Sequence, residues 1–92
     1  MPKYYLFKVA DHYLYFTADC IIEAMHVHAS DRRMTEANSA KFFVRADGSS
    51  VMQKQGDLTE REENTITRFI KENYLDMYKM WKDFGGGEFF RG

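Results

Sequence analysis

The chain has 92 residues, and its 14 acidic and 13 basic side chains leave a formal net charge of −1. This length predicts one domain with a single core, and a charge so close to zero disfavours non-specific binding to nucleic acid or to an anionic membrane. The single cysteine, Cys20, excludes an internal disulfide and favours a reducing compartment. The chain has neither an apolar run long enough to span a membrane nor a signal-peptide pattern in its first residues, so we expect a cytoplasmic protein. No cofactor is expected.

The first half of the chain predicts short strands, because residues rich in Tyr, Phe and Val are bounded by Asp, Gly and Ser. Residues 4–9 and 13–17 flank a short polar loop and should form a hairpin. Residues 25–29 predict the next strand. The segment before them, 18–24, fits either a helical turn capped by Asp19 or an irregular connection.

Two further strands are expected after the polar stretch 30–39, which we expect to be a loop. Residues 41–46 and 50–54 surround Asp47-Gly48, a pair typical of a type I′ hairpin turn, in which both central residues have positive φ. Together these segments predict a small antiparallel sheet of about five strands.

A helix is predicted after Gly56, where the apolar residues begin to recur at every third or fourth position. Thr59 and Glu62 have the spacing of a capping box at its start. The apolar stripe that follows consists of Ile66, Phe69, Ile70, Tyr74, Met77, Trp81 and Phe84. This stripe should pack on one face of the sheet.

A helix over residues 60–83 would be about 36 Å long, more than a sheet of this size can cover. We therefore expect either a break near Asn73 or an overhang that packs on a second subunit. Glycines follow the helix and begin a flexible tail over residues 85–92. Its two phenylalanines, Phe89 and Phe90, are expected to dock in a groove or on a partner.

The elements predict an α+β fold, a small antiparallel sheet with a long or bent C-terminal helical segment packed on one face. The whole chain, 1–92, is expected to form one domain that is strand-rich over 3–56, helical over 59–84 and flexible over 85–92. The helix leaves the other face of the sheet for a site or an interface.

Two of the three histidines, His26 and His28, stand at positions i and i+2 of an expected strand. Side chains of a strand alternate between its faces, so both imidazoles should share one face while Met25 and Val27 point to the core under the helix. The same alternation on the neighbouring strand turns a second set of side chains to the histidine face. If the two strands pair, an open face carries His26, His28, Lys41, Phe43 and Arg45.

This face has three interpretations. In the first, cross-strand aromatic and imidazole contacts form an interface with a second copy or with a small protein partner. In the second, His26 and His28 bind a metal ion, because two imidazoles suit Zn²⁺, although a stable site needs three or four ligands. Further ligand types occur without diagnostic spacing at Asp11, His12, Asp19, Cys20, Glu23 and Asp31.

In the third interpretation, His26 and His28 act as general acid and base on a phosphodiester, as in a small metal-independent ribonuclease. Positive charge for the phosphate would come from Arg32, Arg33, Lys41 and Arg45. The sequence has no Gly-rich phosphate loop and no Ser nucleophile motif to support it. Cys20 and His12 have plainer expected roles, a partly buried apolar residue and an exposed turn residue.

Several short motifs in a fixed order resemble one family. They are Tyr13-Leu14-Tyr15-Phe16, Met25-His26-Val27-His28, Ala40-Lys41-Phe42-Phe43-Val44, Leu58-Thr59-Glu60-Arg61-Glu62 and Met80-Trp81-Lys82-Asp83-Phe84. Over residues 5–84 the chain resembles domain-of-unknown-function family 4160, which typically has a Pro-Pro-His-x-His-Val strand, an Ala-Lys-Phe-Trp strand and an Ala-Trp-Asn-x-Phe helix end. Here Glu23-Ala24-Met25 replaces the prolines and their rigid turn, and Phe43 replaces the Trp. The resemblance implies a bacterial protein, often encoded beside a partner as in toxin-antitoxin pairs, and no established activity.

We therefore expect a protein-interaction or regulatory role, with self-association or a small protein partner. The binding residues would be His26, His28, Lys41, Phe43, Arg45, Phe89 and Phe90. A ribonuclease with catalytic His26 and His28, assisted by Lys41 and Arg45, and a His-based metal-binding protein are the alternatives. The charge does not point to nucleic acid as a partner, and no membrane is expected.

Overall fold

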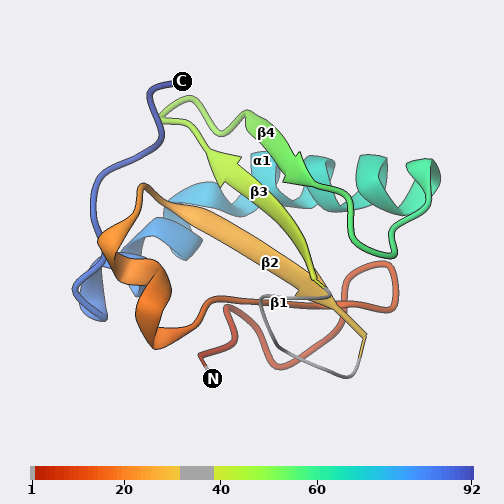
Figure 1. Cartoon of the computed structure of the whole chain (residues 1–92), viewed down its shortest axis with the longest axis horizontal. Helices are drawn as coiled ribbons and strands as arrows, with labels where there is room; N and C mark the ends of the chain where they lie inside the picture. The colour runs from red at the N-terminus through yellow and green to blue at the C-terminus, as the bar shows by residue number, and fades with distance from the viewer. Residues whose placement is uncertain (1, 32–38) are drawn as a thin grey trace.

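The computed structural model describes residues 2–31 and 39–92 (Figure 1). The elements, in chain order, are strand β1 (Tyr13–Tyr15), the 3₁₀ helix η1 (Ala18–Ile22), strands β2 (His26–Ser30), β3 (Ala40–Val44) and β4 (Ser50–Lys54), and helix α1 (Glu60–Asp83). The strands form one antiparallel sheet in the order β1-β2-β3-β4, and α1 lies behind it in this view. This confirms the α+β prediction, with four strands among the described residues where the sequence predicts a fifth. The loop predicted over 30–39 falls mostly outside the described residues.

The fifth strand, predicted over residues 4–9, does not form. The start of this segment still hydrogen-bonds to β1. Further along, the rings of Tyr5 and Phe7 pack on Phe69 of α1, with centroids 5.4 and 6.0 Å away. Packing on the flank of the helix takes the backbone away from β1, so the segment gains aromatic contacts in place of a strand ladder.

The turn conformation predicted for Asp47-Gly48 occurs instead at residues 10–11, in the short polar loop before β1. Among the described residues other than glycine, positive φ occurs at Ala10 (49°) and Asp11 (62°), the pattern of a type I′ turn. The type I′ prediction for Asp47-Gly48 is wrong. Gly48 has a positive φ of 86°, but Asp47 does not have a positive φ. The Asp47 carboxylate instead accepts hydrogen bonds from the Ser49 amide and hydroxyl, at 2.9 and 2.6 Å, which stabilises a different loop.

Segment 18–24 adopts the helical alternative, as one 3₁₀ turn. Its N-cap is Thr17 rather than Asp19. The Cys20 amide donates to the Thr17 carbonyl at 3.0 Å, and the Thr17 amide donates to the Cys20 sulfur at 3.3 Å. The sulfur thus takes the place that a Glu or Gln oxygen has in a capping box, which fixes the orientation of Cys20.

Helix α1 is continuous over Glu60–Asp83, so the predicted break near Asn73 is wrong. The Asn73 side-chain amide donates to the Phe69 carbonyl one turn earlier, at 2.9 Å, and is satisfied within the helix. Buried side chains extend from Ile66 to Trp81, so α1 packs on its own chain over most of its length. In the described part of the chain, no helix is long and apolar enough to cross a membrane.

The main core lies between α1 and one face of the sheet. The register pairs Val27 of β2 with Phe42 of β3, and both side chains are 0% exposed. The strand alternation predicted for this face is therefore correct. The buried sheet side chains of the core are Leu14, Val27, Ala29, Ala40, Phe42 and Val44, and Met25 joins them just before β2.

The capping box predicted at the start of α1 is confirmed and makes stability depend on pH. The Thr59 amide donates to Glu62 Oε1 at 2.9 Å, and the Glu62 amide donates to Thr59 Oγ1 at 3.2 Å. The bond from the Thr59 amide lowers the pKa of Glu62, with smaller contributions from the Thr59 hydroxyl and from His12. Because the folded pKa lies below the unfolded one, the stabilisation is present above the ordinary glutamate pKa of about 4.3 and is lost as the pH falls through the lower folded value.

We predict that Glu62→Gln lowers the free energy of unfolding at neutral pH, and that the difference from wild type shrinks toward zero at an acidic pH where Glu62 is protonated in the folded chain as well. Denaturant unfolding at both pH values measures this difference. Glu60→Gln, which removes a carboxylate from the same first turn, is the control. A Glu62→Gln effect of equal size at both pH values would contradict a charged capping box.

Candidate functional site

The sheet face opposite α1 carries the two histidines, as the alternation predicts. Strands β2 and β3 pair His26 with Phe43 and His28 with Lys41, and β1 places Tyr15 opposite His28. The face is not open, however, because His26 and His28 are 0% and 3% exposed. The face that the helix was expected to leave open is therefore covered, and segments from outside the four strands contribute to the cover.

Cys20 of η1 reaches the histidines and completes a buried cluster. Its sulfur lies 3.3 Å from His28 Nε2, and one ligand-type atom from each of Cys20, His26 and His28 lies within 4.8 Å of the other two. The two imidazole rings are nearly perpendicular, at 89°, with centroids 5.1 Å apart. Cys20 is buried, as expected for an apolar residue, but polar atoms surround its sulfur. We call these three residues the Cys–His cluster.

Hydrogen bonds fix the orientation of both imidazole rings. His26 Nδ1 donates to the Ala24 carbonyl at 2.9 Å. Because a carbonyl oxygen only accepts, this nitrogen carries the proton, and Nε2 of the neutral ring carries the lone pair. His28 Nδ1 bonds to Ser39 Oγ at 2.9 Å, while its Nε2 faces the Cys20 sulfur. Both rings are therefore held by the chain from their Nδ1 side.

The two basic side chains predicted beside the histidines are bonded to other groups. Lys41 Nζ donates to both carboxylate oxygens of Glu23, at 3.0 and 3.1 Å. Arg45 Nε donates to the Gly92 carbonyl at 2.8 Å, and its Nη1 donates to Ser49 Oγ at 3.4 Å. With these charges directed elsewhere and both imidazoles buried, the geometry does not favour acid–base chemistry on a phosphodiester.

Four other ligand types considered for a metal site lie apart from the Cys–His cluster within residues 2–31 and 39–92. They are Asp11, His12, Glu23 and Asp31. The side chain of Asp19, also considered, is not among those that the structure describes. His12, expected to be exposed, is only 8% exposed, because the tight turn before it folds its ring back to the Ala10 carbonyl and to within 3.8 Å of Glu62. Arg32 and Arg33, considered for phosphate binding, lie outside the described residues.

Residues 88–92, which we call the docked segment, run beside the ends of β2 and β3 (Figure 1). The Met25 amide donates to the Glu88 carbonyl at 2.9 Å, and the Phe90 amide donates to the Val44 carbonyl at 2.9 Å. A parallel bridge pairs Arg45 with Phe90. The segment expected to be a flexible tail is therefore bonded beside the sheet through an isolated bridge and backbone hydrogen bonds.

The two phenylalanines of the docked segment lie against different parts of the molecule. Phe90 stacks on Phe43, on the histidine face, with ring centroids 4.3 Å apart. Phe89 stacks on Tyr78 of α1 at 3.9 Å. Both rings are thus docked within the chain itself, Phe90 on the sheet and Phe89 on the helix.

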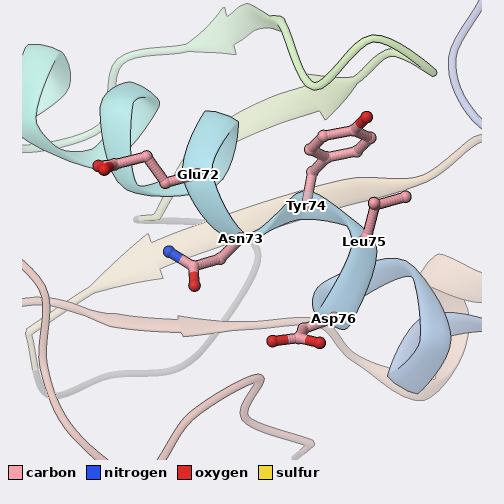
Figure 2. Close-up of a pocket in the computed structure, with 5 residues that line it drawn as sticks. All are labelled: Glu72, Asn73, Tyr74, Leu75 and Asp76. Carbon is pink, nitrogen blue, oxygen red and sulfur yellow. The ribbon is translucent and has the colours of Figure 1, made fainter.

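A hollow of about 140 Å³ on α1 lies away from the Cys–His cluster. Its lining residues are Glu72, Asn73, Tyr74, Leu75 and Asp76. Figure 2 shows these consecutive side chains leaving one helical turn in different directions, with Tyr74 toward the β3–β4 hairpin and Asn73 away from it. Because its lining does not converge on a point, the hollow lacks the arrangement of polar groups that a ligand pocket needs.

Fold and site together define a small α+β domain whose sheet holds a buried cysteine–histidine cluster on the face away from its helix. The chain belongs to the family described as DUF4160, a domain of unknown function, whose model matches residues 12–82. This match confirms the family resemblance, and it contains the Cys–His cluster but not the docked segment. No curated protein and no solved structure matches the chain.

Cys20 and Ser39 are the site residues whose roles sequence reasoning misses. A signal for Cys20 exists, because Thr17 and Cys20 have the spacing of a capping box with sulfur in the last position. Ser39 has no comparable local signal, since its bond to His28 joins residues 11 positions apart across the stretch 32–38. A contact of this kind depends on how the chain returns to the sheet.

Two serine variants test the support of the buried imidazole. Ser39→Ala removes the bonding partner of His28 Nδ1, whereas the Ser50 hydroxyl is buried with no hydrogen-bond partner among the described residues. We predict that Ser39→Ala lowers the free energy of unfolding by about 1–3 kcal/mol and that Ser50→Ala leaves it unchanged or slightly raised. Denaturant unfolding compares them. Equal losses in both variants would show that the bond to His28 adds no specific stability.

Proposed function

We propose that this domain acts by binding a partner chain at the groove that holds its own docked segment, and that the partner is a second copy that exchanges this segment. The observation that carries the proposal is the docking of residues 88–92 beside β2 and β3, through an isolated bridge at Phe90 and backbone hydrogen bonds to Met25 and Val44. Such a groove would suit a regulatory component of a bacterial, cytoplasmic, toxin-antitoxin-like pair, the setting that the family resemblance implies.

The contacts of the docked segment are of a kind that a second copy can supply. Its backbone bonds join it to Met25 and Val44, and its ring stacks join it to Phe43 and Tyr78. The same contacts form if the segment belongs to another chain, so exchange of a terminal element is a low-cost route to a dimer. Strand addition of this kind takes affinity from main-chain bonds and selectivity from side-chain pockets.

The glycines at positions 85–87 connect α1 to the docked segment. A Cβ on Gly85 would meet no atom within 4 Å, and its φ of 88° is a conformation that favours glycine. At Gly86, by contrast, a Cβ would lie 2.3 Å from the Trp81 ring, so glycine there is required by packing. Gly85 is therefore the position best suited to act as the hinge of an exchange.

Two large apolar side chains near this hinge are exposed. Ile22 is 88% exposed, and Phe84, directly before the glycines, is 53% exposed. Ile22 lies near the hinge because the carbonyl oxygen of the adjacent Glu23 is 3.1 Å from the Cβ position of Gly87. In an exchanged dimer two linkers would pass each other at this end of the molecule, and this apolar surface would be removed from water.

Mixing two cysteine variants tests the exchange. Phe43→Cys and Phe90→Cys are made in separate full-length chains, and they replace rings that stack at 4.3 Å. A disulfide between the two variants requires the segment of one chain to lie in the groove of the other. We predict a covalent mixed dimer after oxidation of the mixture, and a wild-type dimer in light scattering at high concentration.

Each variant oxidised alone is the control. The native Cys20 is buried and should form no cross-link of its own. A wild-type chain that stays monomeric at every concentration would contradict self-exchange. So would a wild-type dimer whose mixed variants form no more cross-link than the single variants.

A further inference from the structure

We infer that Cys20, His26 and His28 form a binding site for one divalent metal ion of the zinc type. The three side chains are 1%, 0% and 3% exposed, and their ligand-type atoms lie within 4.8 Å of one another. In tetrahedral zinc sites, where Zn–S is about 2.3 Å and Zn–N about 2.0–2.1 Å, the ligand atoms are roughly 3.4–3.6 Å apart. Cys20 Sγ and His28 Nε2 already have a comparable separation, 3.3 Å. Small side-chain movements would therefore enclose an ion.

The hydrogen bonds on the far side of each ring are a second, independent observation that points to a metal. Histidines that bind a metal almost always donate the N–H of their other ring nitrogen to an oxygen of the protein or to water. His26 does so to the Ala24 carbonyl, and His28 bonds to Ser39 Oγ, both from Nδ1 and both at 2.9 Å. This arrangement turns Nε2 of His26, with its lone pair, away from the Ala24 carbonyl, and Nε2 of His28 faces the Cys20 sulfur, so Nε2 is the ligand atom that we infer for each ring.

Hydrogen bonds hold the Cys20 sulfur in place. The Thr17 amide lies 3.3 Å and the Thr17 hydroxyl 3.1 Å from the sulfur. The sulfur is thus placed by the capping arrangement of η1, while the nitrogens are placed by β2.

The donor set selects the class of metal. One thiolate and two imidazoles suit Zn²⁺ and similar borderline ions, whereas Mg²⁺ and Ca²⁺ require oxygen ligands. When zinc has three protein ligands, a water molecule completes its tetrahedron. On binding, the S–H bond breaks, an S–Zn bond forms and the proton leaves to solvent, so the affinity should fall as the pH falls.

This inference does not depend on the exchange of the docked segment, and its test uses the full-length chain with Co²⁺ as a coloured probe of zinc sites. We expect one equivalent of Co²⁺ to give the visible spectrum of tetrahedral cobalt with a thiolate charge-transfer band, and Zn²⁺ to remove both. The fluorescence of Trp81 gives a second measurement that needs no variant. It is the single tryptophan, its ring lies 5.4 Å from that of His26, and bound Co²⁺ should quench it.

Variants assign the ligands. Cys20→Ser should abolish the charge-transfer band. Ser39→Ala removes only the hydroxyl that orients His28, and it should weaken Co²⁺ binding by roughly 10- to 100-fold. His12→Asn is the matched control, because it removes a buried histidine that lies outside the Cys–His cluster. Circular dichroism establishes that each variant is folded. The inference is overturned if the reduced wild-type chain shows no saturable Co²⁺ spectrum and no quenching, or if His12→Asn loses binding to the same extent as folded Cys20→Ser.

Discussion

Burial of the central strand on both faces is the constraint on which the rest of the structure depends. All five residues of β2 are buried, although α1 lies behind one face of the sheet. Trp81 of α1 also packs on His26 of the other face. In the described part of the chain, two segments far apart in the sequence contribute to the cover of that face, η1 and the docked segment. Each is tied to the sheet by specific groups, the Cys20 sulfur at His28 and the Phe90 ring on Phe43. The sheet thereby has a layer of buried side chains on each of its faces.

The second layer is polar at its centre, and this explains why its groups are so closely paired. A buried imidazole costs free energy unless its nitrogens are hydrogen-bonded, which ties His26 to Ala24 and His28 to Ser39. The same layer connects the Cys–His cluster to the docked segment, because His26 packs on both Trp81 and Phe43. Trp81 in turn donates to the Gly87 carbonyl at 2.9 Å. The two proposals therefore concern adjacent parts of one layer.

Sequence reasoning succeeds where the signal is local and fails where distant segments meet. The period of α1, its capping box at Thr59, and the alternation that puts His26 and His28 on one face are properties of neighbouring residues, and all are present. The positive φ of Ala10 and Asp11 could not be predicted, because neither residue is the glycine or asparagine that usually indicates positive φ. The covering of the histidine face cannot be predicted from the sequence for another reason. The 3₁₀ helix η1 and the docked segment flank β2 only after the chain has folded.

Amide hydrogen exchange at Met25 and Phe90 tests the closure of this face most directly. The Met25 amide donates to Glu88, and the Phe90 amide donates to Val44. If the second layer is part of the folded core, both amides should exchange as slowly as those of β2, through openings close to global unfolding. Exchange of both at the rate of an unstructured peptide, while β2 stays protected, would contradict this account.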